Sequence, residues 1–372
     1  MKQVRLAIEE RVAETAEADL QSLFTRKLPK KGFSEKWMEK NLEKYGAKLL
    51  TSDGWLRPIP QIKEGESELT TIGDLAAHLR LGLEELEWFS DLKNLNPAEG
   101  RLAHYRYRWI PKRKGGKRLL MEPKESLKIA QRRILDTILE QIPLHDAAHG
   151  FRKERSIRTY AEPHCGKRVV VRMDLADFFP SVTQARVTGL FRMLSYRDPV
   201  AKHLAGLCTH GAPKRITRDL RLQQRHLPQG APTSPYLANA IAFRLDCRLS
   251  GLAKSAGLVY TRYADDLAFS GERITESFRD LVNVIILEEG FLINPRKTRV
   301  MTSSTRQRLA GVVVNEHPNV SRRDFDLLKA ILHRGPSMDE KEILRGEIAA
   351  VQMVNLRRGT KLMTLFEDVS WK

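Results

Sequence analysis

Two adjacent acids, Asp265 and Asp266, lie between two short runs of apolar and β-branched residues, LVYTRYA and LAFS. Runs of this kind predict two strands joined at the acidic pair. A third run, RVVVRMD, is typical of a buried strand and ends in Asp174. Because an unpaired carboxylate is costly to bury, each acid must meet cations or water. The fold is therefore limited to one that brings these strand ends to such partners.

If the strands are neighbours, two or three of these carboxylates gather around one spot. Side chains along a strand point alternately to opposite faces, so Asp265 and Asp266 are equivalent only if the turn rotates one of them back. Hard oxygen ligands suit Mg²⁺, which takes one or two carboxylates and completes its shell with waters and substrate phosphates. A pair of such ions would support an in-line phosphoryl displacement, that is, nucleotidyl transfer. An isolated Asp-Asp pair is also common as a turn or cap, so its surroundings decide its meaning.

The charge balance indicates the class of partner. The 372 residues include 64 Lys and Arg against 46 Asp and Glu, a formal net charge of +18. This excess favours nucleic acid, although charge alone does not separate RNA, DNA and an acidic membrane surface. The three cysteines are widely spaced and form no Cys-x-x-Cys pair, which excludes a disulfide framework and a four-cysteine zinc site. No apolar run approaches the roughly 18 residues of a membrane span, so we expect a cytoplasmic protein with no membrane partner.

The chain divides into three parts. Residues 1–65 open with a charged helical pattern and end in a turn-rich linker, so we expect an N-terminal accessory region. Residues 66–320 alternate short strands with longer helices, and residues 321–372 are basic and mostly helical. In the middle part we expect a helix capped by Ser181 and one long apolar helix over Pro235–Leu252.

Four segments resemble the motifs of reverse transcriptases in their order and spacing. They are IPKRKGGKR (110–118), MDLADFFPSV (173–182), LPQGAPTSPYLAN (227–239) and YADDLAFSG (263–271). The match leaves residues 1–65 outside it. The resemblance implies an α+β right-hand polymerase fold, with fingers and palm over 66–320 and a helical thumb over 321–372. The charged helical pattern of residues 1–65 adds a helical N-terminal extension to this fold. It also implies an RNA-directed DNA polymerase that uses dNTPs and two Mg²⁺ ions, or Mn²⁺ in their place.

The resemblance assigns roles at the reacting centre residue by residue. Asp174 and Asp265 become the principal metal ligands, and Asp266 becomes the third carboxylate. Phe179 falls where the family keeps a bulky ring under the sugar of the incoming nucleotide. A ring there would clash with a 2′-hydroxyl and favour dNTPs. A Phe-Phe pair after a strand would otherwise be interpreted as part of the core.

The resemblance also places five residues at the nucleotide. Gln229 and Gly230 match the Pro-Gln-Gly turn that lies against the nucleotide, where a glycine lets the backbone approach closely. The segment HYRYRWIPKRKGGKRLL predicts a hairpin with a basic tip. In it, Lys112 and Arg118 match the finger residues that hold the triphosphate, although a solvated basic turn would show the same residues. Lys297 matches the lysine near the leaving pyrophosphate, a place that neighbouring arginines could also take.

Within the family, the chain is most similar to the bacterial retron group, because it carries YADDLAFSG, GAPTSP and HGFRKERSI. Retron enzymes typically show Asn-Ala-x-x-His and Val-Thr-Gly. Residues 160–164 (YAEPH) keep the alanine and the histidine of the first signature, and residues 309–311 (LAG) keep only the glycine of the second. His164 also fits a core histidine. The resemblance implies a structured non-coding RNA as template and primer, a branched RNA–DNA product (msDNA) primed from an RNA 2′-hydroxyl, and phage defence with a separately encoded effector protein.

Two other functions remain open at this point. The chain could be a reverse transcriptase of another bacterial group, such as a group II intron-like, diversity-generating or defence-associated enzyme. It could also be a catalytically idle nucleic-acid-binding protein that kept the fold. The second is less favoured, because an idle descendant would tend to lose carboxylates that are costly to keep.

Overall fold

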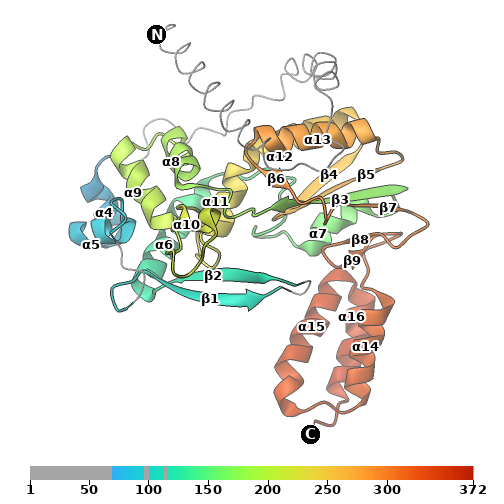
Figure 1. Ribbon diagram of the computed structural model, residues 1–372. Helices are drawn as coiled ribbons and strands as arrows, with labels where there is room; N and C mark the ends of the chain where they lie inside the picture. The colour runs from blue at the N-terminus through green and yellow to red at the C-terminus, as the bar shows by residue number, and fades with distance from the viewer. Residues whose placement is uncertain (1–68, 96–99, 113–114, 372) are drawn as a thin grey trace. The chain divides into compact units, whose positions relative to one another are not determined.

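The computed structural model describes residues 69–95, 100–112 and 115–371 (Figure 1). The accessory region predicted over residues 1–65 lies outside the described residues. The strands are β1 (Tyr105–Pro111), β2 (Lys117–Pro123), β3 (Val169–Ala176), β4 (Val259–Tyr263), β5 (Asp266–Gly271), β6 (Leu292–Ile293), β7 (Arg299–Thr302), β8 (Arg308–Leu309) and β9 (Val312–Val313). The α-helices are α4 (Ile72–Leu79), α5 (Leu83–Ser90), α6 (Glu125–Thr137), α7 (Ile157–Ala161), α8 (Gln184–Met193), α9 (Asp198–Cys208), α10 (Leu220–Gln223), α11 (Ser234–Ile241), α12 (Phe243–Ser255), α13 (Glu276–Glu288), α14 (Arg322–His333), α15 (Lys341–Val354) and α16 (Leu356–Glu367). Short 3₁₀ helices are η2 (Leu139–Gln141), η3 (Glu162–His164) and η4 (Met338–Glu340).

Strand β3 lies at the centre of a five-stranded antiparallel sheet. Strand β5 pairs with one edge of β3 and β4 lies outside β5, while β6 and β7 pair with the other edge of β3. Val170 and Val171 in β3 are fully buried, as their apolar, β-branched run predicts. Helices α12 and α13 cover one face of this sheet, and α7 lies on the other (Figure 1).

The prediction that β3 ends at Asp174 is wrong by two residues. Leu175 and Ala176 continue the strand because they pair with the short strand β6, more than 110 positions further along the chain. Within the sheet, Asp174 pairs with Asp266 of β5. A pairing between distant segments therefore places the acid inside the strand rather than at its end.

Two helix predictions also need correction. Helix α8 begins at Gln184 after Thr183, so Ser181 does not cap it. Ser181 belongs instead to a tight turn, where its hydroxyl donates to the Phe178 carbonyl and its amide donates to the Asp177 carbonyl. The single helix expected over Pro235–Leu252 is two helices, α11 and α12, which are separated at Ala242.

Helices α14, α15 and α16 form a C-terminal unit with its own apolar core. Ser321 begins α14, since its hydroxyl accepts a hydrogen bond from the Asp324 amide. A second core joins the β8–β9 hairpin to α7 and the five-stranded sheet, with Leu309 and Val312 beside Tyr160 and with Val354 at the end of α15. The core of the C-terminal unit consists of Leu328, Leu332, Leu344, Ile348, Val351, Leu362 and Phe366. In the described part of the chain, no helix is both long and apolar enough to cross a membrane.

His164 is a fully buried, satisfied core histidine. Its Nδ1 lies 2.6 Å from the Ser270 hydroxyl, and its Nε2 lies 2.7 Å from the Thr261 hydroxyl. Burial lowers the pKa of His164 to about 3, and the nearby positive charges of His149 and Lys167 act in the same direction. The imidazole therefore connects η3 to β4 and β5 as a neutral group.

This burial predicts a loss of stability in acid. The folded protein keeps His164 neutral down to about pH 3, whereas the unfolded chain takes up that proton below its ordinary pKa of 6.5. The unfolded state binds more protons in this window. The free energy of unfolding should therefore decrease as the pH is lowered, by up to about 1.4 kcal/mol per pH unit from this residue. Urea unfolding between about pH 7 and about pH 5 should show a shallower pH dependence in His164→Asn than in the wild type. Equal slopes would contradict this account.

Candidate active site

A cavity of about 630 Å³ brings distant parts of the chain together. Its walls come from the β1–β2 hairpin, the end of β3 with the turn that follows it, α10 with the loop after it, and the turn between β4 and β5. Among the residues that the sequence assigns to the site, those that line the cavity are Lys112, Arg118, Asp174, Phe179, Gln229, Asp265 and Lys297. Asp266 and Gly230 lie beside this lining rather than in it.

The carboxylates of Asp174 and Asp265 face the same cavity. The Leu175 amide donates to the Asp265 carbonyl at 2.8 Å, which ties the β4–β5 turn to β3. Burial, then the negative charge of Asp174 and then that of Asp266 together raise the pKa of Asp265 to about 6. The shift indicates that three acids lie within electrostatic reach of one another.

Lys297 is the cation held against this acidic group. Its Nζ donates to Asp174 Oδ2 at 2.9 Å and lies 2.8 Å from Asp174 Oδ1. Burial would lower the pKa of Lys297, but the hydrogen bond to Asp174 and the charges of Asp174 and Asp265 raise it overall. The Asn294 amide donates to the Asp174 carbonyl at 2.7 Å, so the segment that carries Lys297 is also fixed to β3 through its backbone.

Asp266 has different surroundings from Asp265. Its Oδ1 lies 3.9 Å from Nε of Arg172, which is two residues before Asp174 on β3.

In the described residues, no three His, Cys, Asp or Glu side chains are grouped closely enough to ligate a metal ion by themselves. Asp174 and Asp265 nevertheless fit Mg²⁺, which needs only one or two carboxylates when substrate phosphates and water complete its shell.

A buried arginine supports the turn that carries Asp265. Arg262 is fully buried beneath this turn and donates to the Ala264 carbonyl at 3.1 Å and to Asn239 Oδ1 at 2.9 Å. It also forms a bidentate ion pair with the fully buried Asp246, at 2.6 and 2.8 Å. Gly150 fits against the same turn, since a Cβ there would lie only 2.6 Å from the Ala264 amide nitrogen. One feature of the sequence points to this support: Arg262 is a charged residue in a strand whose other residues are uncharged.

The basic hairpin is joined directly to the Gln229 loop. Lys112 and Arg118 lie at the far end of the β1–β2 pairing, where the Lys112 amide donates to the Gly116 carbonyl at 2.9 Å. Further along β2, the Met121 amide donates to the Gln229 carbonyl at 2.9 Å. Gly230 has φ +126°, and a Cβ there would lie 3.0 Å from the Met121 carbonyl oxygen. Only glycine allows this close approach of the loop to the strand.

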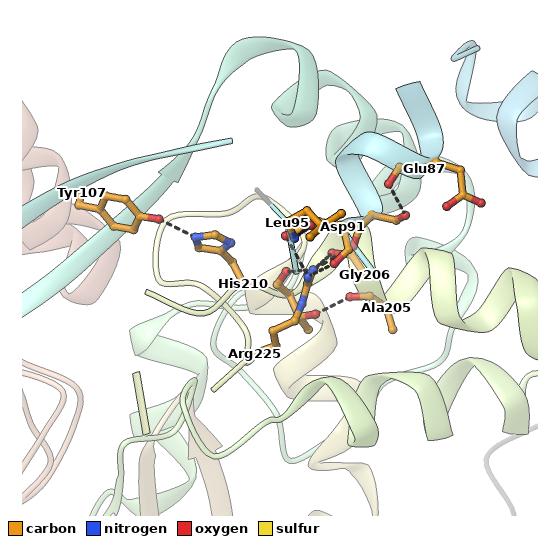
Figure 2. A network of polar contacts seen from close by, with 10 residues as sticks. Glu87, Asp91, Leu95, Tyr107, Ala205, Gly206, His210 and Arg225 are labelled. Carbon is orange, nitrogen blue, oxygen red and sulfur yellow. Dashed lines mark hydrogen bonds and ion pairs between the residues drawn. The ribbon is translucent and has the colours of Figure 1, made fainter. Parts of the chain in front are cut away.

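A second connection runs through the polar network in Figure 2. The Tyr107 hydroxyl on β1 lies 2.6 Å from His210 Nε2, and the backbones of His210 and His226 pair in both directions. Arg225, next to His226, holds this segment to α5 and α9. Its guanidinium donates to the carbonyls of Ser90, Asp91, Gly206 and Thr209. The hairpin, the Gln229 loop and the helices behind them are therefore hydrogen-bonded into one unit.

The two phenylalanines after β3 have different positions. Phe178 is buried, with 4% of its surface exposed, and its ring contacts Phe291 of the core at 5.7 Å. Phe179 is half-buried in the cavity wall, and its ring lies 6.0 Å from that of the exposed Phe151. The interpretation of the pair as core residues therefore holds for Phe178 alone.

Comparison with known proteins shows the family. Residues 110–321 match the family model described as reverse transcriptase (RNA-dependent DNA polymerase). The retron Mx65 reverse transcriptase of Myxococcus xanthus is 40% identical over 351 residues, which cover 88% of this chain and 80% of that protein. The retron Mx162 enzyme of the same organism is 38% identical, over 82% of this chain and 68% of that protein. The retron Ec86 reverse transcriptase of Escherichia coli is 33% identical, over 73% of this chain and 83% of that protein.

These matches agree with the geometry. All four motif segments contribute residues to one cavity, and the mixed helix and sheet architecture is that of a right-hand polymerase. Because the family model covers more than half of the chain and the retron enzymes cover most of it, the chain belongs to the reverse transcriptase family, as a retron-type RNA-directed DNA polymerase.

Proposed function

We propose that this polymerase copies a structured non-coding RNA into DNA, starting from a 2′-hydroxyl of that RNA, and yields a branched RNA–DNA molecule (msDNA). The observation that carries the proposal is the shared cavity, in which Asp174 and Asp265 lie with the cations Lys112, Arg118 and Lys297. The similarity to three retron reverse transcriptases supports the retron product.

In this proposal, Asp174 and Asp265 hold two Mg²⁺ ions, with Mn²⁺ as a substitute, and Asp266 is the third carboxylate beside them. When bound, such ions lower the pKa of the attacking hydroxyl and offset the charge that develops on the phosphates. Lys297, which donates to Asp174 in the structure, would neutralise that carboxylate before the substrate arrives and then donate a hydrogen bond to the leaving pyrophosphate. The repulsion among these carboxylates, which adds to burial in raising the pKa of Asp265, would favour a cation at this site.

The incoming dNTP is held by the other walls of the cavity. Lys112 and Arg118 bind the triphosphate, because fixed cations stabilise the charge of a transferring phosphoryl group. Gln229 and Gly230 form the loop against which the nucleotide lies, and their bond to β2 keeps that loop at the hairpin. Phe179 lies under the sugar and excludes a 2′-hydroxyl.

We assign the fingers and palm to residues 66–320 and the thumb to residues 321–372. The cap of α14 at Ser321 supports this boundary, and the separate core of α14, α15 and α16 supports a thumb that is a unit of its own. Its basic residues would bind the RNA template and the DNA product through phosphates and shape. Anti-phage defence would need a separately encoded effector protein, and we place the enzyme in the cytoplasm.

One experiment tests the retron product. The gene is expressed with its native flanking DNA, and nucleic acid bound to the purified wild-type protein and to Asp265→Asn is digested separately with RNase and DNase. A defined DNA species attached to RNA, found only with the wild type, is the expected result. Bound RNA without DNA in both samples would instead indicate another reverse transcriptase group or an idle binder.

Phe179→Ala should relax the choice of sugar. Removing the ring opens the space that a 2′-hydroxyl needs, so the ratio of kcat/KM for dNTPs to that for rNTPs should fall by about 10–200-fold. Single-nucleotide extension with dGTP and GTP measures this ratio. The buried neighbour provides the matched control, since Phe178→Leu should leave the ratio unchanged. A ratio that Phe179→Ala does not change removes this residue from sugar selection.

A further inference from the structure

An arginine from a distant segment holds the turn between Asp174 and Phe179. Arg221 lies on the short helix α10 and lines the same cavity. Its Nη1 forms an ion pair with Oδ2 of Asp177. Asp177 is the first residue after β3 and comes two residues before Phe179. The pair therefore joins the turn after β3 to the segment that leads into the Gln229 loop.

Asp219 fixes the direction of this arginine. Its Oδ1 accepts from Arg221 Nε at 3.1 Å, and its Oδ2 accepts from Nη2 at 2.8 Å. The Asp219 side chain also accepts from the Arg221 amide at 3.0 Å. A planar guanidinium held at two nitrogens by one carboxylate has little freedom left. The remaining nitrogen is thereby aimed at Asp177.

Stability alone does not explain this arrangement. The side chains of Arg221 and Asp177 are 62% and 44% exposed, and ion pairs at such exposure contribute little to folding. The backbone of Asp177, by contrast, is left-handed, with φ +48°. A residue with a Cβ adopts this conformation at a cost, and such residues cluster where a turn must hold a functional group. Phe179 follows Asp177 by two residues, so the conformation of this turn sets where its ring lies.

We propose that Asp219, Arg221 and Asp177 form a positioning set that places the Phe179 ring and so determines how strictly the enzyme rejects ribonucleotides. The inference rests on the proposed role of Phe179 at the sugar. None of the three side chains needs to touch the sugar itself, because they act through the turn. The set comes from α10 and the turn after β3, two segments that the sequence separates by more than 40 residues.

The test compares the dGTP to GTP ratio of kcat/KM across matched variants in the full-length enzyme. Arg221→Gln and Asp177→Asn should each lower this ratio by about 10-fold. The double variant should lower it no further, because both changes remove the same ion pair. Arg221→Lys keeps the charge but loses the two-point contact with Asp219, so it should restore part of the selectivity. Arg192→Gln is the control, since Arg192 forms a similarly exposed pair with Asp198 at a site outside the cavity.

The Phe179→Ala background separates the two proposals. If the set acts through the ring, Arg221→Gln should have no further effect on the ratio once Phe179 is alanine. If Phe179→Ala lowers the ratio but Arg221→Gln does not, the positioning role is overturned and the role of Phe179 stands. A loss of kcat/KM that is equal for dGTP and GTP would instead make Arg221 a contact for the triphosphate, which also overturns the proposal. An unchanged ratio in Phe179→Ala overturns both.

Discussion

Asp265→Asn is expected to abolish DNA synthesis while leaving the protein folded. The amide keeps the size of the side chain but removes the charge that would bind a divalent cation, an interaction that contributes several kcal/mol to the transition state. At about 1.4 kcal/mol per tenfold in rate, turnover should fall by about 1,000-fold or more. Stability should be equal or higher, because the carboxylate is buried beside Asp174 and Asp266 and its pKa is raised to about 6.

Single-turnover extension of an RNA-templated primer in Mg²⁺ measures the first effect, and urea unfolding measures the second. Asp280→Asn is the matched control, because burial also raises the pKa of Asp280, on helix α13, outside the cavity lining. That variant should keep its turnover. Wild-type turnover in Asp265→Asn would remove Asp265 from the metal site.

Arg262→Met should produce the largest loss of stability of any single change considered. The substitution leaves the Asp246 carboxylate buried without its bidentate partner, and breaking a buried pair in this way costs about 3–5 kcal/mol. It also frees the carbonyl of Ala264, whose backbone is left-handed in the catalytic turn, so activity should fall with stability.

The free energy of unfolding from urea titrations followed by circular dichroism gives the magnitude. If Arg262→Met is too unstable to purify, Arg262→Lys, which keeps the charge but not the fork of hydrogen bonds, should show a smaller loss in the same direction. The exposed ion pair between Arg192 and Asp198 is the control for the buried one. Arg192→Gln should change the free energy of unfolding by less than about 1 kcal/mol. A loss below that value in Arg262→Met would show that the buried pair does not hold the turn.

Local patterns in the sequence predicted the elements that depend on neighbours in the chain. The strands around Asp265 and the basic hairpin form where runs rich in aromatic, β-branched or other apolar residues flank a turn, and each appears in the structure. One prediction failed where a distant segment decides, because pairing with β6 extends β3 beyond Asp174 and this partner is not visible in the local sequence. The other failed locally, because Ser181 closes a tight turn onto the carbonyls of Asp177 and Phe178 before α8 begins.

In the candidate site, too, the local sequence predicted some residues, while the contacts of others depend on distant segments. The motifs named Asp174, Asp265, Phe179 and Lys297, and the structure brings these four to one cavity, with Asp266 beside it. The residues that position them were missed. Arg262 could have been identified from the sequence, because a charged residue inside a buried strand needs a buried partner. Arg221 could not have been identified in this way, because RITRDLRLQQR has the composition of a solvated polar segment. Only the fold brings Arg221 to Asp177.

The bond between Met121 and Gln229 has a consequence for exchanging parts between relatives. A hairpin transplanted from another enzyme would bring its own β2 backbone to a loop shaped by Gly230, where any added Cβ would meet the strand. Such a chimera should be active only if β2 and residues 227–230 are exchanged together. These two segments would then evolve as one unit, even though more than 100 residues separate them in the chain.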